Sequence, residues 1–178
     1  MANETMTLIS TVSMGGVNTI TFSSISANYT DLKILLSARS TRAGDSAVGI
    51  TFNTSGGTYA NRRLYGNGST VGSDSQTAGG LAYANIPGAG STSNTYGNIE
   101  IYIPNYGSSN AKSYSADVVE ENNSTSTYVQ QMLFASSWSG TSAISSITLY
   151  DWNGANFDTY SSASLYGILK GSGGATVS

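Results

Sequence analysis

Oxygen-bearing side chains that could bind a metal ion are concentrated in one short stretch of the sequence. Asp151, Asn153, Asn156 and Asp158 lie within eight residues, and Ca²⁺ prefers carboxylate and carbonyl oxygens as ligands. The stretch does not match an EF-hand loop, which has glycine at position six and ends in a bidentate glutamate. Because Asp and Asn also favour turns, a turn is the preferred interpretation and a calcium site the alternative.

The residue types that most enzymes use for catalysis are missing. The chain has no His and no Cys, which removes the commonest general base, the thiol nucleophile and most zinc ligands. Glu120 and Glu121 are neighbours, so on a strand they point to opposite faces and make a poor pair for glycoside hydrolysis. The sequence predicts a protein that is not an enzyme and has no cofactor. A carboxylate pair assembled from distant strands is the open alternative.

Basic residues form one small cluster, Arg62-Arg63, which Arg39 and Arg42 could join. The chain carries 7 Lys and Arg against 10 Asp and Glu, a net charge of -3. A nucleic-acid-binding domain is expected to be far more basic, so no nucleic-acid partner is predicted. A guanidinium group has several donors, which suits contact with a neighbouring subunit. The alternative is that one arginine pairs with a carboxylate and the other is solvated.

Aromatic residues are abundant, with 12 Tyr and 2 Trp, while only 10% of the residues are charged. These aromatics could stack on sugars at a receptor-binding tip, or they could form the core and rim of the fold, which is preferred. A Tyr-rich surface with little charge also suits burial against other subunits. The candidate subunit or capsid contacts are Arg62, Arg63, Tyr65, Tyr102, Tyr106 and Trp152.

The clearest structural element is a strand at residues 98–103. Ile99, Ile101 and Ile103 fall on one face of an extended chain, with Glu100 and Tyr102 on the other. One apolar and one wettable face indicate an antiparallel sheet that packs on a core with one side. The proline at position 104 ends this strand, and residues 105–108 form a turn before a return strand at 112–119. The pattern predicts a β-hairpin.

Similar short strands separated by turns recur along the whole chain. Residues 30–39 are expected to be extended because Leu32, Ile34 and Leu36 share a face at a period of two. Residues 69–93 are expected to form a long surface connection with one short strand near 80–86. About nine or ten short strands without a helix predict an all-β, antiparallel β-sandwich of jelly-roll type.

Domain organisation is expected to be simple. The 178 residues predict one β-sandwich domain at 7–169, with a flexible arm at 1–6 and a flexible Gly-rich tail at 170–178. The start lacks the pattern of a signal peptide, and the longest apolar runs are far too short to span a bilayer. We therefore expect a soluble protein with no membrane partner, and the absence of cysteine fits intracellular assembly.

Several stretches resemble a family of virion proteins from tailed bacteriophages of marine and cyanobacterial hosts. The similar segments are residues 7–12, 29–39, 62–68, 97–106 and 162–168. The resemblance implies a non-enzymatic particle component. Proteins of this kind are described as virion structural or tail-fibre proteins, and β-sandwiches of this size also serve as capsid decoration (cement) proteins, often as trimers.

Capsid decoration is the expected role, because the chain lacks the shaft repeats and the collagen-like glycine period of a fibre. This role implies a homo-oligomer, expected to be a trimer, that is assembled in the host cytoplasm and binds the major capsid protein on the capsid exterior. The alternative is a tail or tail-fibre tip subunit that binds a host surface glycan. The sequence leaves open capsid or tail location, oligomeric state, partner surface, host, and binding of a glycan or calcium ion.

Overall fold

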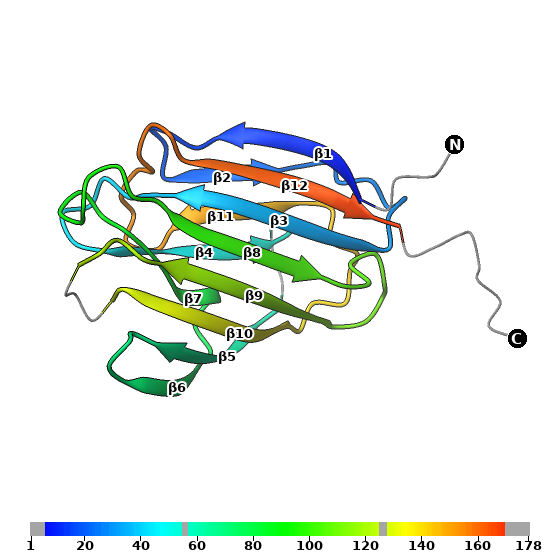
Figure 1. Ribbon diagram of the computed structural model, residues 1–178. Helices are drawn as coiled ribbons and strands as arrows, with labels where there is room; N and C mark the ends of the chain where they lie inside the picture. The colour runs from blue at the N-terminus through cyan, green and yellow to red at the C-terminus, as the bar shows by residue number, and fades with distance from the viewer. Residues whose placement is uncertain (1–5, 55–56, 125–127, 170–178) are drawn as a thin grey trace, which may run out of the picture.

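The computed structural model describes residues 6–54, 57–124 and 128–169. These residues form twelve β-strands and no helix, so the described chain has no helix that could cross a membrane. Neighbouring strands pair antiparallel in two sheets, ordered β1-β12-β3-β8-β9-β10-β5-β6 and β2-β11-β4-β7 (Figure 1). The strands are β1 (Met6–Ser13), β2 (Thr19–Phe22), β3 (Asp31–Ala38), β4 (Ser46–Phe52), β5 (Tyr59–Gly66), β6 (Val71–Gln76), β7 (Gly80–Ile86), β8 (Gly97–Ile103), β9 (Lys112–Glu120), β10 (Gln130–Trp138), β11 (Ile147–Asp151) and β12 (Ser162–Ile168).

The connectivity is that of a jelly roll with two additional hairpins. The strands β1, β12, β3 and β8 lie in one sheet and β2, β11, β4 and β7 in the other, so the chain alternates between sheets as a jelly roll requires. The hairpins β5–β6 and β9–β10 add four strands to the larger sheet beyond β8. We call these four strands the extension. The prediction of an antiparallel, jelly-roll-like β-sandwich is confirmed.

One predicted surface connection contains a strand that the sequence did not indicate. The strand at 80–86 is confirmed as β7, but residues 71–76 form β6, the edge strand of the larger sheet. The sequence of β6, VGSDSQ, has no alternating apolar side chains because neither of its faces enters the core. Its pairing with β5 brings the total to twelve strands, above the nine or ten predicted.

The core lies between the two sheets and follows the predicted alternation. Ile99, Ile101 and Ile103 of β8 are 0% exposed, and each lies opposite a buried leucine or isoleucine of β3 in the antiparallel register. The inner faces of both sheets join in one apolar cluster. Full burial of such a side chain contributes about 1.5–3 kcal/mol, so this alternation is the main source of the fold's stability.

The inner face of the extension is filled by aromatic side chains. Trp138 of β10 is 1% exposed and Tyr114 of β9 is 3% exposed. Both pack edge-on against Phe52 of β4, with ring centroids 5.6 and 5.1 Å apart, an arrangement that aromatic pairs prefer. The interpretation of the aromatics as core holds for these residues.

Both predicted terminal segments fall largely outside the described residues. The sequence predicts an arm at 1–6, but Met6 already belongs to β1 and pairs with Ile168 of β12. Residues 1–5 and the tail at 170–178 lie outside the described ranges.

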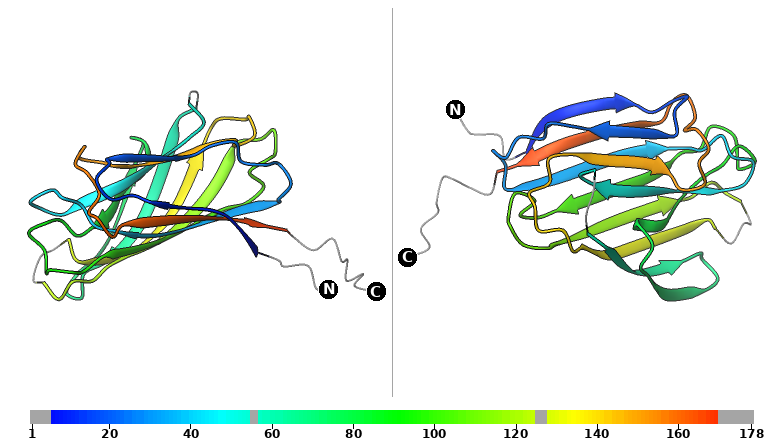
Figure 2. Two further views of the ribbon diagram at one scale, coloured as in Figure 1. Left: turned by 90° about the horizontal axis from the view of Figure 1, so that it is seen from above. Right: turned by 180° about the vertical axis from the view of Figure 1, so that it is seen from behind.

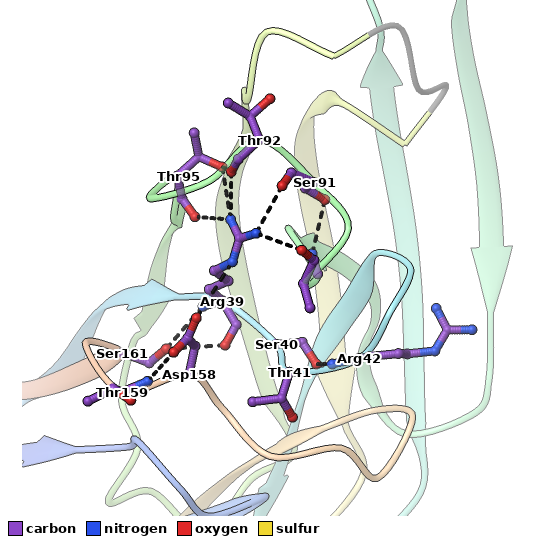
Figure 3. Close-up of polar contacts among 12 residues, drawn as sticks. Arg39, Ser40, Thr41, Arg42, Ser91, Thr92, Thr95, Asp158, Thr159 and Ser161 are labelled. Atoms are coloured by element: carbon purple, nitrogen blue, oxygen red, sulfur yellow. Dashed lines mark hydrogen bonds and ion pairs between the residues drawn. The ribbon is translucent and has the colours of Figure 1, made fainter.

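A buried arginine fastens one of the loops at an end of the sandwich (Figure 3). Arg39, just after β3, is 5% exposed. Its Nη1 donates to the carbonyl oxygens of Thr92 (2.8 Å) and Thr95 (2.9 Å), and its Nη2 donates to that of Ser91 (3.0 Å). Its Nε lies 3.7 Å from a carboxylate oxygen of Asp158. Arg39 therefore ties the β7–β8 loop to the end of β3.

Replacing this arginine should destabilise the protein. Arg39→Ala leaves loop carbonyls without their charged donor, so we expect the free energy of unfolding to fall by about 1–3 kcal/mol in chemical denaturation. Arg42→Ala is the matched control, because the Arg42 side chain is exposed and, among the described residues, hydrogen-bonds only to the Asp45 carbonyl. Its effect should stay within about 0.5 kcal/mol. Equal effects of the two substitutions would contradict the assigned role.

Candidate functional site

The extension provides the most distinctive surfaces of the molecule. The larger sheet has eight strands and the smaller four. As a result, the β5–β6 hairpin extends past β7, the edge strand of the smaller sheet, as the view from behind shows (Figure 2). Side chains alternate along β5, so the hairpin presents one set of residues toward β7, on its inner face, and another set on its outer face. Both faces are candidate binding surfaces.

Arg63 is the central residue of the inner face. Its Nε lies 3.0 Å from each carboxylate oxygen of Asp74, directly opposite on β6, and its Nη2 lies 2.8 Å from one of them. The guanidinium carbon lies 4.6 Å from the ring centroid of Tyr65 and 4.9 Å from that of Tyr83. The side chain is only 12% exposed. Arg63 therefore joins β5, β6 and β7, and the prediction that it contacts another subunit is not supported by this position.

A bulge in β7 lies directly against this arginine. Leu81 and Tyr83 have positive φ angles of 57° and 72°, which is uncommon for large side chains and needs support from neighbours. Asn61 supplies part of it, because its Nδ2 donates to the Gly79 carbonyl (2.8 Å) and its Oδ1 accepts from the Leu81 amide (3.2 Å). Arg63 Nη1 donates to the Tyr83 carbonyl (3.3 Å). The bulge leaves the Tyr83 side chain 43% exposed.

The outer face of the extension carries an exposed apolar patch, which we define as Leu64, Val71 and Leu133. These residues are 61%, 90% and 51% exposed. Leu64 of β5 lies directly opposite Leu133 of β10, so the two form an adjacent cross-strand pair. Arg62 and Ala135 lie opposite each other on the same face and, with Leu64 and Leu133, line a hollow of about 500 Å³. Exposed apolar side chains grouped in this way mark interaction sites.

The six predicted contact residues do not form one surface. Arg62 is exposed on the outer face and forms no ion pair within the described ranges. Tyr65 packs on Arg63 on the opposite face. Tyr102 donates a hydrogen bond to Asp31 (2.5 Å), and Trp152 stacks on Tyr150 with ring centroids 5.9 Å apart.

The prediction for Tyr106 is wrong. Its side chain is 1% exposed and belongs to the core, and its hydroxyl donates to the carbonyl of Ser26. Tyr106 belongs to the turn after β8, and its ring packs into the core cluster instead of facing solvent. Sequence reasoning also missed Leu64 and Leu133. The signal for Leu133 was present, since it alternates with the buried Met132 and Phe134 and must therefore face outward.

The Asp- and Asn-rich stretch after β11 forms a turn. Asp151 is 3% exposed, and its carboxylate accepts hydrogen bonds from the hydroxyls of Ser40 (2.6 Å) and Ser46 (2.9 Å) and from the Asn153 amide (2.9 Å). Asp158 lies apart from this group, beside Arg39. In the part of the chain that the structure describes, no three acidic side chains are grouped so that they could hold a metal ion.

The arginines at 39, 42, 62 and 63 are likewise dispersed. Arg39 is buried among loop carbonyls and Arg42 is exposed in a loop, whereas Arg62 and Arg63 lie on opposite faces of β5. The four side chains therefore do not act as one basic cluster.

Glu120, at the end of β9, is a buried carboxyl group with an unfilled hydrogen-bonding position. It is 0% exposed, its Oε2 has no hydrogen-bond partner, and its Oε1 lies 3.5 Å from Nδ2 of Asn122. Burial raises the pKa of Glu120 to about 8, and the nearby carboxylate of Asp45 adds to the shift. Glu121 is exposed and accepts a hydrogen bond from the Asn123 amide (2.6 Å). Glu120 lines a cavity of about 320 Å³.

Comparison with known proteins yields no relative from which a role could be transferred. No protein-family model matches the sequence, and searches of curated proteins and of solved structures found no match.

The carboxyl group of Glu120 makes the stability of the protein depend on pH. Its pKa in the folded chain, about 8, lies above its ordinary value of 4.5, so the folded state holds this proton more tightly than the unfolded state. The resulting stabilisation is complete below pH 4.5 and is lost as the pH rises toward 8. We expect the free energy of unfolding to fall across this range by up to about 1.4 kcal/mol per pH unit.

Urea denaturation at a series of pH values measures this dependence. Glu120→Gln keeps the shape of the side chain and cannot ionise, so it should flatten the profile between pH 5 and 8. Glu121→Gln is the control, since that exposed residue should leave the slope as in the wild type. A slope that Glu120→Gln does not change would assign the pH dependence to other groups.

Proposed function

We propose that this chain is a non-enzymatic structural protein that works by adhesion, and that its main contact surface is the outer face of the extension. The observation that carries the proposal is the exposed patch of Leu64, Val71 and Leu133, grouped on the strands of the extension beside an arginine without an ion pair in the described chain. This face offers apolar area and hydrogen-bonding groups, so binding is the action that its chemistry supports.

The edge of the larger sheet adds a second means of contact. β6 pairs with β5 on one side only, so its other side presents backbone N–H and C=O groups to an incoming strand. A partner that adds a strand there gains main-chain hydrogen bonds, while the neighbouring apolar patch supplies burial. Val71 belongs to both features because it is the first residue of β6.

The specific role that we propose is decoration of a phage capsid. The jelly roll is an architecture of viral capsid domains among others, and the sequence segments described above resemble phage virion proteins. In this role the protein forms a homo-oligomer, proposed to be a trimer, on the capsid exterior and binds the major capsid protein. Many modest contacts repeated over the shell would then add through multivalency.

A tail or tail-fibre tip subunit is the second candidate. The observation that favours it is a cleft on the inner face of the extension, lined by tyrosine and carboxamide side chains. Copy number per purified particle distinguishes the two roles, because a decoration protein covers the whole shell and a tail subunit occupies only one vertex. Quantitative mass spectrometry of the particle measures it.

Charge placed in the apolar patch should prevent self-association. We expect the double variant Leu64→Asp/Leu133→Asp to raise the dissociation constant of the oligomer by about tenfold or more, because a carboxylate must then be desolvated in the interface. Analytical ultracentrifugation over a concentration series measures the effect, and circular dichroism verifies folding.

Leu8→Asp is the matched control for this experiment. Leu8 is 54% exposed on β1, at the opposite edge of the same sheet, so its replacement should leave the oligomer unchanged. A wild-type protein that stays monomeric and does not bind purified capsids would contradict the proposal. Equal dissociation by Leu8→Asp would place the interface elsewhere.

A further inference from the structure

The inner face of the extension contains a cleft that the proposed assembly role does not use. The cleft has a volume of about 370 Å³, within the range of small-molecule sites. Three segments that are far apart in the sequence contribute to it: β5 with the turn that follows, β7, and the start of β10. The residues that line it are Arg63, Tyr65, Asn67, Thr70, Tyr83, Asn85, Tyr128 and Gln130.

We propose that this cleft is a binding site for a neutral saccharide. Sugars combine apolar C–H faces with hydroxyl groups that both donate and accept hydrogen bonds. Tyrosine offers an apolar ring with a polar hydroxyl, and carboxamide side chains carry both a donor and an acceptor. The cleft has three residues of each kind.

The tyrosines supply the surface on which a sugar ring would pack. Tyr83 and Tyr128 both line the cleft. They are 43% and 59% exposed, so part of each side chain is open to a ligand. Tyr65 and Tyr83 are held by Arg63, whose guanidinium group lies over both rings. A ring that is fixed in advance loses little conformational entropy when a ligand binds.

The carboxamides supply the hydrogen bonds. Asn67 Oδ1 accepts from the amides of Ser69 (3.1 Å) and Thr70 (2.8 Å), which orients the side chain and leaves its NH₂ group for a ligand. Asn85 Nδ2 donates to the Tyr128 carbonyl at 3.4 Å, which leaves its Oδ1 as the acceptor. The lining therefore offers one donor on the β5–β6 turn and one acceptor on β7.

The electrostatics of the cleft favour an uncharged ligand. Arg63 is the one charged residue in the lining, and its charge is balanced by Asp74 at 2.8 Å. A phosphate or an acidic sugar would need an uncompensated cation. The adjoining cavity of about 320 Å³ shares Asn67 and Gln130 with the cleft and is lined by the buried Glu120, one oxygen of which lacks a partner. A second sugar unit could extend there.

The backbone of β7 is shaped so that Tyr83 faces the cleft. Tyr83 reaches the lining from a bulge with a φ of 72°, and bulges frequently re-aim side chains at functional sites. The side chains of Asn61 and Arg63 hold this bulge from β5. Strain that is maintained by two neighbouring side chains is typical of a binding site.

Saccharide binding can be tested independently of assembly, because the cleft and the apolar patch lie on opposite faces of β5. The full chain is applied to an array of neutral oligosaccharides built from glucose, galactose, mannose and N-acetylglucosamine, with sialylated and sulfated glycans beside them. The best neutral glycan is then titrated in solution by isothermal calorimetry. We expect a neutral glycan to bind and to be preferred over the acidic ones.

Substitutions in the lining locate the binding site. Tyr128→Ala and Tyr83→Ala should each raise the dissociation constant about tenfold or more, since each removes a packing surface. Tyr83→Phe keeps the ring and should bind more tightly than Tyr83→Ala. Tyr128 lies outside the strands, so its variant remains informative if Tyr83→Ala disturbs the bulge.

The outer-face variant is the control for saccharide binding. Leu64→Asp/Leu133→Asp should leave saccharide affinity unchanged even where it dissociates the oligomer. Failure to bind any neutral glycan, a preference for acidic glycans, or binding that survives both Tyr83→Ala and Tyr128→Ala would overturn the proposal.

Discussion

The unequal size of the two sheets is the constraint on which the rest of this structure depends. Eight strands face four, so the extension cannot be covered in the way that the jelly-roll strands are. Near the smaller sheet, Trp138 and Tyr114 pack on Phe52 and exclude water. Farther out, at the β5–β6 hairpin, β7 is the last strand of the smaller sheet, and the Arg63–Asp74 ion pair packs beside it between the rings of Tyr65 and Tyr83. The two candidate surfaces occur at this boundary, where β7 covers only part of the inner face and the outer face is exposed.

Arg63 is a charged residue that occupies a mostly buried position. An isolated guanidinium would be costly to bury, yet Asp74 balances its charge and two tyrosine rings cover it. The same side chain bonds to the Tyr83 carbonyl and so sets the shape of β7. The inner cleft and the outer patch therefore rest on one strand, with Arg63 facing one way and Leu64 the other.

The buried polar groups near the loops fall into two kinds. Arg39 and Asp151 are each surrounded by several hydrogen-bond partners, so their role is to fasten loops. Glu120 has an oxygen without a partner, and burial, with the nearby carboxylate of Asp45, raises the pKa of its carboxyl group. Satisfied buried groups rigidify a fold, whereas an unsatisfied one calls for a functional explanation. Glu120 lines the cavity next to the inner cleft.

The sequence by itself determined the class of fold, because period-two alternation such as that of Ile99, Ile101 and Ile103 specifies which side chains enter the core. It also indicated β7, but not β6, since an edge strand that packs on no core needs no apolar pattern. Only the tertiary structure decided which strands are neighbours, and thereby placed Leu64 against Leu133 and Arg63 against Asp74. It likewise buried Tyr106, although the turn chemistry around that residue suggested the surface. The physical reason is that alternation is a property of a single strand, whereas register and coverage are set by the packing of residues distant in the chain.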